Sequence, residues 1–433
     1  MKMSEVPSRV HFVGVGGVGQ SGLAKHLVRL GKNVSGSDLQ QSQALVDLQQ
    51  SGIAVSVGHF ADNIGNAELV VRTSAVGNDN VEVDEARRRG IPVVLREELL
   101  GAIFNQYPVR IAVCGTHGKT TVTAMISHIL HKCGVEHTAF IGGYYHGQNY
   151  CFGNNVVVAE ACEYNRSFLQ LHPTVTVCLN CEFDHPDCYK NSAEVRSAFG
   201  MLADQTSLSF VCPQALVDLS ERSVVFGTGG ISAENIRLCC GKPTFDLFRD
   251  GKFVHCCKMN VVGAHNVNNA LAALTATDIV DVPLLQATQA ICSFDGVDRR
   301  WTEKQSFCKI AVDYAHHPTE ISSAIKCAQS LSKHTLCVFQ PHTFSRTKAF
   351  FTQFAECFRG VSVVYLPIYA AREAPQVGVT SKALTEYAKS IGVDAVYAND
   401  FNQAESIVRT RATADTLVLI LGAGNVVQLA DRF

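Results

Sequence analysis

Residues 11–22 read HFVGVGGVGQSG, and they decide the fold predicted for the first part of the chain. An apolar run typical of a strand leads into a loop with glycines at 14, 16, 17 and 19, and residues 21–31 have a helical pattern. A strand, a glycine-rich turn and a helix in this order predict a phosphate-binding loop at the edge of a parallel sheet. Asp38 follows the last of these glycines by 19 positions, close to the spacing of an acid that binds a cofactor ribose, so a nicotinamide cofactor is one candidate ligand.

The composition indicates a folded protein of two or three domains. The chain has 433 residues, of which 47% are apolar and 18% charged, with a net charge of −2. Lysine and arginine are spread along the sequence, so no basic run predicts binding to nucleic acid or to an anionic membrane. No stretch of about 18 apolar residues is present and the first residues lack a signal-peptide core, so we expect no membrane insertion and a cytoplasmic location.

The 17 cysteines are scattered along the chain, which favours reduced thiols in a reducing compartment. Cys178 and Cys181 have the spacing of a metal or redox pair, but no second pair at zinc-site spacing accompanies them. We interpret them as small apolar residues at a buried strand end.

Strand and helix patterns alternate along the chain, which predicts an α/β fold with parallel, doubly wound sheets. The expected strands are 9–15, 33–38, 69–76, 109–115, 156–161 and 175–180, followed by four that begin KIAVDYAHH, TLCVFQPH, VSVVYLPIY and TLVLILGAG. The expected helices are 21–31, 81–89, 119–134 and 263–277. Changes in this pattern near residues 105 and 300 predict domains 1–104, 105–299 and 300–433.

A second glycine-rich loop, CGTHGKTT at 114–121, also joins a predicted strand to a predicted helix. Gly115 and Gly118 let backbone N–H groups wrap phosphate oxygens, and Lys119 can reach the outer phosphates. A threonine hydroxyl that follows the lysine can bind Mg²⁺. Five positions before Gly118 the usual P-loop has a glycine, whereas this chain has Val113, so the loop is a shortened variant. The pattern predicts an ATP site.

Polar residues follow two of the predicted apolar strands. Glu160 ends one strand and is a candidate ligand for the Mg²⁺ that neutralises ATP phosphates, although a lone glutamate there is equally consistent with a surface residue. Asn180, Asp184 and His185 follow the next strand. In an open α/β sheet, ligands gather at the carboxyl ends of the strands, so we expect both groups near a ligand.

Nine motifs along the chain resemble those of the Mur ligase family. They are GVGGVGQSG (14–22), SGSD (35–38), GTHGKTT (115–121), AEACEYNRSF (159–168), NCEFDHPD (180–187), GAHNVNNALA (263–272), FDGVDRR (294–300), DYAHHPTE (313–320) and QPHTFSRT (340–347). They cover the chain from near residue 10 to GAGN at 422–425. Any one of them is weak evidence, but nine in family order make the resemblance specific.

The resemblance implies three domains: an N-terminal Rossmann-like domain for a UDP-sugar, a central P-loop ATPase-like α/β domain, and a C-terminal Rossmann-like domain that contacts ATP and an amino acid. It also implies the reaction of one branch of the family, which joins L-alanine to the lactyl carboxylate of UDP-N-acetylmuramate in peptidoglycan precursor synthesis. In that reaction the carboxylate attacks the γ-phosphate of ATP, and the amine of alanine attacks the resulting acyl phosphate. ATP and two Mg²⁺ ions are the implied cofactors.

The resemblance also assigns residues to ATP and metal. The implied ATP contacts are Gly115, Thr116, His117, Gly118, Lys119, Thr120, Thr121, His265, Asn266, Asn269, Arg300 and Asp313. Thr120 and Glu160 match the ligands of one Mg²⁺, and His185 matches a ligand of the second. A carboxylate and a triphosphate have to approach each other, so cations such as Lys119 and Arg299 suit catalysis.

Two further groups of residues are assigned to the other substrates. The implied UDP-sugar contacts are Gly14, Gly16, Gly17, Val18, Gly19, Gln20, Ser21, Ser37, Asp38 and Ser74, with the glycines on the diphosphate. Tyr314, His316, His342 and Arg346 match positions near the amino acid. An arginine suits the alanine carboxylate, and either histidine can accept the ammonium proton. The predicted catalytic residues are therefore Lys119, His185, Arg299, His316 and His342.

The chain departs from the commonest family pattern at several positions. Gln20 stands where a methionine is common, Val312 where an acid is frequent, and Thr343 where an arginine is frequent. EACEYN at 160–165 stands in place of the frequent EADESD. We interpret these differences as variation within one branch of the family.

Two other functions remain open at this stage. A nicotinamide-dependent oxidoreductase explains the first glycine loop and Asp38, but leaves Lys119 and Glu160 without a role. A Mur-family ligase that attaches a peptide to the same UDP-sugar during wall recycling is the second, and that branch usually lacks the GGxG form found at 16–19. The expected partners are UDP-N-acetylmuramate and L-alanine, with no nucleic acid, and the expected state is a monomer or weak homodimer.

Overall fold

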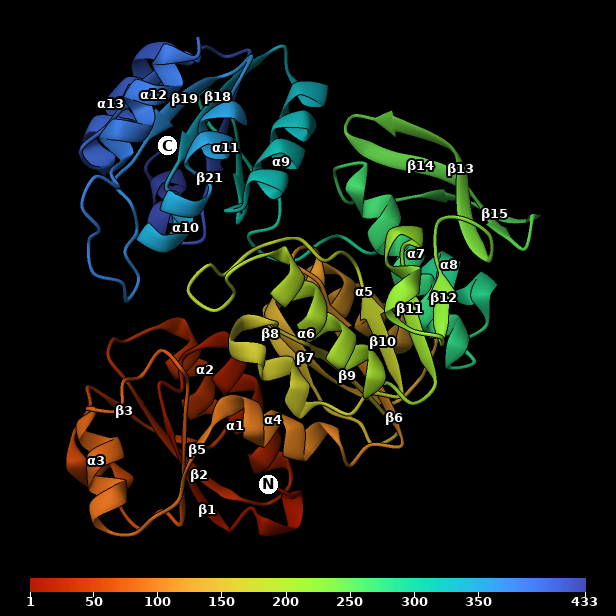
Figure 1. The fold of residues 1–433 in the computed structure, drawn as a ribbon, viewed down its shortest axis with the longest axis vertical. Helices are drawn as coiled ribbons and strands as arrows, with labels where there is room; N and C mark the ends of the chain where they lie inside the picture. The colour runs from red at the N-terminus through yellow and green to blue at the C-terminus, as the bar shows by residue number, and fades with distance from the viewer. The chain divides into compact units, whose positions relative to one another are not determined.

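The computed structural model describes all residues from Met1 to Phe433 and divides into two compact units (Figure 1). The first unit holds Met1–Cys181, Arg196–Gly230 and Ala272–Ala290, and the second holds Glu182–Val195, Ile231–Leu271 and Ile291–Phe433. Two sheets with mainly parallel strands belong to the first unit, and one antiparallel and one mainly parallel sheet belong to the second. The predicted α/β class is confirmed.

The first sheet has five parallel strands in the order β3-β2-β1-β4-β5. The strands are β1 (Arg9–Val13), β2 (Asn33–Asp38), β3 (Ala54–Val57), β4 (Leu69–Arg72) and β5 (Val93–Leu95), and the helices are α1 (Val18–Arg29), α2 (Gln43–Gln50), α3 (Val81–Arg88) and α4 (Arg96–Phe104). Side chains of Ser42 and Asn80 cap α2 and α3 by accepting backbone N–H groups. Because β1 pairs with both β2 and β4, its carboxyl end is the switch point where such sheets bind ligands.

The second sheet has seven strands in the order β12-β11-β10-β6-β9-β7-β8. The strands are β6 (Val109–Cys114), β7 (His137–Tyr145), β8 (Gln148–Cys151), β9 (Val156–Glu160), β10 (Val175–Cys178), β11 (Ser209–Cys212) and β12 (Ser223–Val225). The helices that follow in this part of the chain are α5 (Lys119–Lys132), α6 (Ser192–Asp204), α7 (His265–Ile279) and α8 (Leu284–Cys292). β6, β9 and β10 are adjacent and parallel, so the residues after them meet at one edge of the sheet.

The second unit contains an antiparallel three-stranded sheet and a six-stranded sheet in the order β16-β17-β21-β18-β19-β20. The strands are β13 (Ile231–Cys239), β14 (Lys242–Arg249), β15 (Lys252–Lys258), β16 (Thr302–Gln305), β17 (Lys309–Asp313), β18 (His334–Phe339), β19 (Ser362–Tyr365), β20 (Ala395–Tyr397) and β21 (Thr416–Leu421). The helices are α9 (Pro318–Leu331), α10 (Phe344–Ala349), α11 (Phe351–Glu356), α12 (Ser381–Ser390) and α13 (Phe401–Arg411). Alternate residues of β18 enter two separate apolar clusters, so both faces of this sheet are covered.

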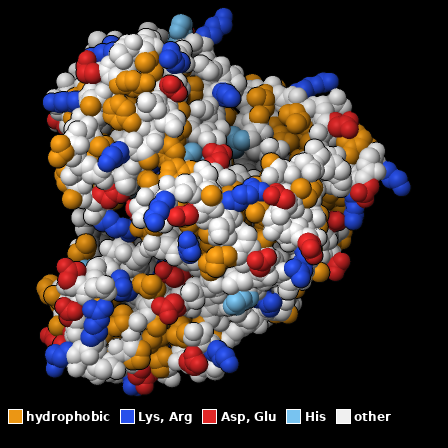
Figure 2. Space-filling view, in the orientation of Figure 1, with side chains coloured by type: hydrophobic (Ala, Val, Ile, Leu, Met, Phe, Trp, Pro, Cys, Tyr) orange, Lys and Arg blue, Asp and Glu red, His pale blue; other side chains and the backbone are white.

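Every strand and helix expected from the sequence is present, with ends that differ by a few residues. The hairpin of β7 and β8 and the sheet of β13 to β15 were not predicted. No helix in the structure has both the length and the apolar character needed to cross a membrane. On the face drawn in Figure 2, lysines and arginines are interspersed with aspartates and glutamates, in keeping with the absence of basic runs in the sequence.

Candidate active site

The first glycine loop, residues 14–19, is held at the carboxyl end of β1 by backbone contacts. The N–H groups of Gly14 and Val15 both donate to the Ser37 carbonyl, at 2.8 and 2.9 Å. Gly16 N donates to Asp38 Oδ2 at 2.9 Å, and a Cβ on Gly16 would lie 2.9 Å from that same oxygen. A larger residue at this position would push the Asp38 carboxylate away, and the loop leads directly into α1.

A cavity of about 510 Å³ lies beside this loop within the first unit. Its walls include loop residues Gly14, Gly17, Val18 and Gly19, the β4 turn residues Thr73, Ala75 and Val76, the β7 residues Phe140, Ile141 and Gly142, and Glu160 and Cys162. The first glycine loop and the predicted metal ligand thus border one cavity. A ligand with its phosphates on the loop can extend towards Glu160.

Several of the predicted UDP-sugar contacts hold this region together through hydrogen bonds or do not line the cavity. Ser37 is fully buried and donates to Glu82 Oε2 at 2.6 Å. Asp38 lines the cavity, and its carboxylate accepts from the backbone N–H groups of Gly16 and Leu39. Ser74 is not among the cavity residues. Contact of these side chains with a UDP-sugar stays a prediction.

Glu82 is a fully buried carboxylate that the sequence analysis missed. It accepts from Ser37 Oγ and Asn63 Nδ2, both at 2.6 Å, and lies 3.2 and 3.3 Å from ring nitrogens of His11 and His59. Burial raises the pKa of Glu82, but hydrogen bonds from His11, Ser37 and Asn63 outweigh burial and bring its pKa to about 2. Since His59 lines the cavity, an ionised Glu82 fixes an imidazole on the cavity wall.

Arg96 supplies a cation to the cavity wall and was also missed. It is the first residue of α4, and a Cβ on Gly19 would lie 2.9 Å from its Nη1 atom. A guanidinium beside a glycine-rich loop suits a diphosphate, because arginine binds phosphate oxygens in pairs. Arg96 directly follows the strand-like run VVL. A cation at the end of a predicted strand was the signal that could have indicated a ligand contact here.

The second glycine loop has the predicted form, with β6 leading into it and α5 leading out. Gly115 and Gly118 have φ values of +136° and +84°, which favour glycine. Asn180, after β10, fixes the loop with its side-chain amide: its Oδ1 accepts from His117 N at 2.9 Å, and its Nδ2 donates to His117 O at 3.1 Å. The predicted polar residue after β10 therefore shapes the phosphate loop itself.

Lys119 is paired with Glu163, a buried acid that the sequence analysis did not assign. Its Nζ donates to the two carboxylate oxygens of Glu163 at 3.1 and 2.9 Å. Burial lowers the pKa of Lys119, but the carboxylates of Glu163 and Glu160 outweigh burial and raise its pKa above the ordinary range. Lys119 is thus a cation at neutral pH. The available signal was the second acid of EACEY, Glu163, which stands between Cys162 and Tyr164, two departures from the common pattern.

The residues predicted for the first Mg²⁺ fit that ion chemically. Thr120 Oγ1 donates to Glu160 Oε2 at 2.8 Å, and Gly142 N donates to the same oxygen at 3.1 Å. A hydroxyl and a carboxylate oxygen so close together are the oxygen ligands that Mg²⁺ prefers. The structure therefore places the two predicted ligands side by side at the edge of the cavity.

In the second unit, Arg346 forms a bidentate pair with Asp184. Arg346 Nε and Nη2 donate to the two Asp184 oxygens at 2.9 and 3.1 Å, and both side chains are 6% exposed. Burial raises the pKa of Asp184, but the guanidinium outweighs burial and holds its pKa well below the usual range. His185, predicted for the second Mg²⁺, places its Nε2 3.8 Å from Asp184 Oδ2. The face of Arg346 that was predicted to bind the alanine carboxylate already binds Asp184.

His316 and His342 lie close together, with ring centres 6.0 Å apart. Burial lowers the pKa of His316 to about 3 and that of His342 to about 4, so both rings are neutral at pH 7. His316 Nδ1 lies 3.0 Å from the Tyr314 carbonyl, which can only accept, so this nitrogen carries the proton. His342 Nδ1 lies 3.2 Å from Arg346 Nη1, which can only donate, so this nitrogen is the acceptor. The two rings are therefore held in opposite tautomers.

Tyr314 lies between the two predicted arginines. The guanidinium carbons of Arg299 and Arg300 are each 4.9 Å from the centre of its ring. Arg299 also donates from Nη2 to Gly424 O at 3.1 Å, while Arg300 pairs with Glu320 at 3.4 Å. Both cations are thus brought to the carboxyl edge of the six-stranded sheet, next to Asp313 at the end of β17.

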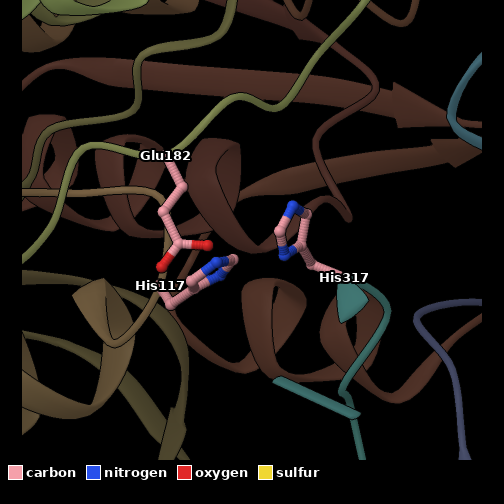
Figure 3. A group of neighbouring side chains, drawn as sticks. All are labelled: His117, Glu182 and His317. Carbon is pink, nitrogen blue, oxygen red and sulfur yellow. The ribbon is translucent and has the colours of Figure 1, made fainter. Parts of the chain in front are cut away.

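Three of the predicted ATP contacts, His265, Asn266 and Asn269, lie at the start of α7. Asn266 Nδ2 donates to Val262 O at 2.8 Å, and Asn269 Nδ2 donates to Asn266 Oδ1 at 2.9 Å. Burial lowers the pKa of His265, and Arg300 adds to this effect. His317, labelled with Glu182 in Figure 3, caps α9 by accepting from Thr319 N, while Glu182 accepts from Thr319 Oγ1 at 2.6 Å.

Three family profiles match the chain in the order of its sheets. They are the catalytic domain of the Mur ligase family over residues 9–108, the Mur ligase middle domain over 113–277, and the glutamate ligase domain of the Mur ligases over 299–424. A relative from Caldanaerobacter subterraneus, named UDP-N-acetylmuramate–L-alanine ligase, is 36% identical over 98% of this chain and 97% of its own length. The chain belongs to the Mur ligase family.

Solved structures agree with this assignment. The UDP-N-acetylmuramate–alanine ligase of Thermotoga maritima is similar with a TM-score of 0.83 and 29% identity, over 98% of each chain. This match confirms the three-domain α/β fold. A murein peptide ligase of Psychrobacter arcticus is similar in fold with a TM-score of 0.73, at 18% identity over 98% of each chain.

The oxidoreductase hypothesis, which rested on the first glycine loop and Asp38, is not supported.

The buried carboxylate of Asp313 is expected to make the stability of this Mur ligase depend on pH. Its carboxylate accepts from Trp301 N and Ala315 N, and burial raises its pKa from 3.8 to about 6 despite Arg300. A raised pKa stabilises the folded state fully below pH 3.8, and this contribution is lost as the pH rises to about 6. Asparagine does not ionise, so Asp313→Asn is expected to remove this pH-dependent loss of stability.

The measurement is urea unfolding at pH 4 and pH 7, followed by the fluorescence of Trp301, the only tryptophan of the chain. The difference in stability between Asp313→Asn and the unaltered chain should move in favour of the variant as the pH rises. Asp415→Asn, at an exposed acid of the same unit, is the control and should show no such trend. Equal pH dependence in Asp313→Asn and the unaltered chain would show that Asp313 is already ionised at pH 4.

Proposed function

We propose that this chain is an ATP-dependent ligase that joins L-alanine to the lactyl carboxylate of UDP-N-acetylmuramate in peptidoglycan precursor synthesis. The observation that carries the proposal is full-length similarity to curated ligases of that name. The cavity that borders both the first glycine loop and Glu160 adds support, since the reaction brings a nucleotide-linked carboxylate to ATP. A recycling ligase that attaches a peptide is the less favoured reading, because the murein peptide ligase matched at lower identity.

The chemistry has two steps. A lactyl carboxylate oxygen attacks the γ-phosphorus of ATP, and the bond to ADP breaks. The amine of alanine then attacks the acyl phosphate, and phosphate leaves as the amide forms. Lys119 is the cation assigned to the transferred phosphoryl group, with the backbone N–H groups of residues 115–121 around the other phosphates. Thr120 and Glu160 would hold one Mg²⁺ and His185 a second, and these ions would neutralise charge on the phosphate oxygens.

The tautomers favour His316 as the proton acceptor for the alanine ammonium group. With its proton on Nδ1, His316 has the Nε2 lone pair available, whereas the Nδ1 lone pair of His342 already accepts from Arg346. Because Arg346 is bound by Asp184, we assign Arg346 a positioning role for His342 and Asp184.

The remaining predicted residues are assigned to the other parts of the substrates. Glycines 14–19, with Arg96 and Asp38, are assigned to the UDP part, and Ser37 and Ser74 keep their predicted place nearby. His265, Asn266, Asn269, Arg300 and Asp313 are assigned to the nucleoside of ATP, and Arg299 to the phosphoryl group. Tyr314 is assigned to the amino acid. The domain limits 1–104, 105–299 and 300–433, a cytoplasmic location, and a monomer or weak homodimer complete the proposal.

The test is an ADP-release assay with purified protein, Mg-ATP, UDP-N-acetylmuramate and single amino acids, with NADH absorbance followed in parallel. ADP release is expected only when the sugar nucleotide and alanine are both present, with no NADH signal. Glycine and serine are the controls, since one methyl group in a pocket discriminates by only about 10- to 200-fold. Release that needs a peptide in place of alanine would favour the recycling ligase, and release without the sugar nucleotide would overturn the proposal.

A further inference from the structure

Gln20 and Asn149 each carry a buried amide oxygen that has no hydrogen-bond partner. Both residues are 1% exposed, and both line the cavity beside the first glycine loop. An acceptor left unpaired in the interior destabilises the fold, so a protein seldom keeps two of them in one place without a use. The pair indicates that the cavity receives hydrogen-bond donors.

The orientation of each amide is fixed by its nitrogen. Gln20 Nε2 donates to Val13 O at 3.3 Å, and Asn149 Nδ2 donates to Val18 O and Ser21 Oγ at 2.7 and 2.8 Å. A flip of either amide would place its oxygen against a carbonyl, so the oxygen is the unpaired atom. The partners of Asn149 are two and one residues from Gln20, so the two amides form one polar cluster at the start of α1.

The cluster is linked both to the glycine loop and to the strand that contacts Glu160. Gln20 follows Gly19, the last glycine of the loop, directly. Asn149 precedes Tyr150, which pairs with Phe140 of β7, and Gly142 of the same strand donates to Glu160. In UDP-N-acetylmuramate the sugar ring separates the diphosphate from the lactyl carboxylate. With the diphosphate on the loop and the carboxylate towards Glu160, the ring falls beside the cluster.

We propose that Gln20 and Asn149 are specificity-determining residues for the amino sugar, with their amide oxygens accepting hydrogen bonds from its N–H and O–H groups. The diphosphate offers only acceptors, so it is not the partner of these oxygens. This inference rests on the proposed function, and it gives Gln20, which stands where methionine is common, a role in this chain.

Gln20→Met tests the inference, because methionine has a similar length and removes the acceptor without adding a charge. Gln205→Met is the matched control: Gln205 Nε2 also donates to a carbonyl, Leu169 O at 3.3 Å, and its oxygen is also unpaired, but it does not line the cavity. The dissociation constants of UDP and of UDP-N-acetylglucosamine are measured by calorimetry, with kcat and KM for UDP-N-acetylmuramate and the unfolding temperature of each variant.

In Gln20→Met we expect UDP-N-acetylglucosamine to bind about 3- to 10-fold more weakly and KM to rise by the same factor, with kcat and UDP binding within about 2-fold. The unfolding temperature should change little, because Gln20→Met removes the unpaired oxygen together with the 3.3 Å hydrogen bond from Nε2 to Val13 O. Gln205→Met should leave all binding constants unchanged. Equal weakening of UDP and the sugar nucleotide, or no weakening, would overturn the inference. Absence of ADP release by the unaltered chain would instead overturn the proposed function.

Discussion

Replacing Lys119 with alanine is expected to lower kcat about 10²- to 10³-fold, the effect of removing one preorganised group that stabilises developing charge. The affinity for UDP-N-acetylmuramate should stay within about 2-fold, because Lys119 is not among the residues of the cavity beside the first loop. Steady-state ADP release gives kcat, and calorimetry with the sugar nucleotide gives the affinity. Joint loss of both would contradict the division between the two glycine loops.

A control separates the charge of Lys119 from its part in folding. Without Lys119, the buried carboxylate of Glu163 loses the cation 2.9 Å away, and the variant will be less stable. In Lys119→Ala combined with Glu163→Gln, the carboxylate is neutral, so part of the stability should return. Activity should remain low in the double variant. Recovery of turnover together with stability would show that Lys119 acts only through the fold.

Asp184→Asn is expected to lower the free energy of unfolding of the second unit by about 3–5 kcal/mol, because it leaves the buried Arg346 cation without its carboxylate. Urea unfolding followed by the fluorescence of Trp301 measures this loss in the unit that contains the pair. The low pKa of Asp184 means that its contribution is present above about pH 4 and is lost as the pH falls. The difference between variant and unaltered chain should therefore shrink in acid.

Two further variants test whether Asp184 and Arg346 form a buried pair in which each charge depends on the other. Asp184→Leu with Arg346→Met replaces both charges by apolar side chains and should recover most of the stability lost in the single variant. Glu386→Gln breaks the exposed pair with Lys389, whose side chains are 72% and 50% exposed, and should cost less than about 1 kcal/mol. A loss of that small size in Asp184→Asn would contradict a buried, mutually dependent pair.

The sequence predicted the strands and helices well where they lead into motifs. The two glycine loops predict β1 and β6, because a phosphate-binding loop of this kind joins a strand to a helix through a tight turn. The hairpin of β7 and β8 carries no such motif, and the pairing of its nine-residue and four-residue strands is interrupted by a register shift. The sheet of β13 to β15 is exposed along much of its length, so its residues lack the apolar runs that mark buried strands.

The sequence named the residues that lie in the family's motifs, and missed Arg96, which no motif contains, and two acids that act on other side chains. Thr120 and Glu160 were named from the motif and lie 2.8 Å apart. Glu163 and Glu82 were missed because their partners, Lys119 and His59, are distant in sequence and meet only in the fold. Asp184 was noted in its motif, but its pairing with Arg346, 162 residues away, depends on tertiary packing that no local pattern encodes.

The central claim, an acyl phosphate formed from the lactyl carboxylate, has a direct test in oxygen transfer. UDP-N-acetylmuramate labelled with ¹⁸O in both carboxylate oxygens is incubated with Mg-ATP, L-alanine and the protein, and the released phosphate is analysed by mass spectrometry. We predict that each phosphate carries one ¹⁸O and that the new amide keeps the other. Phosphate without label, released in step with the amide product, would contradict the account.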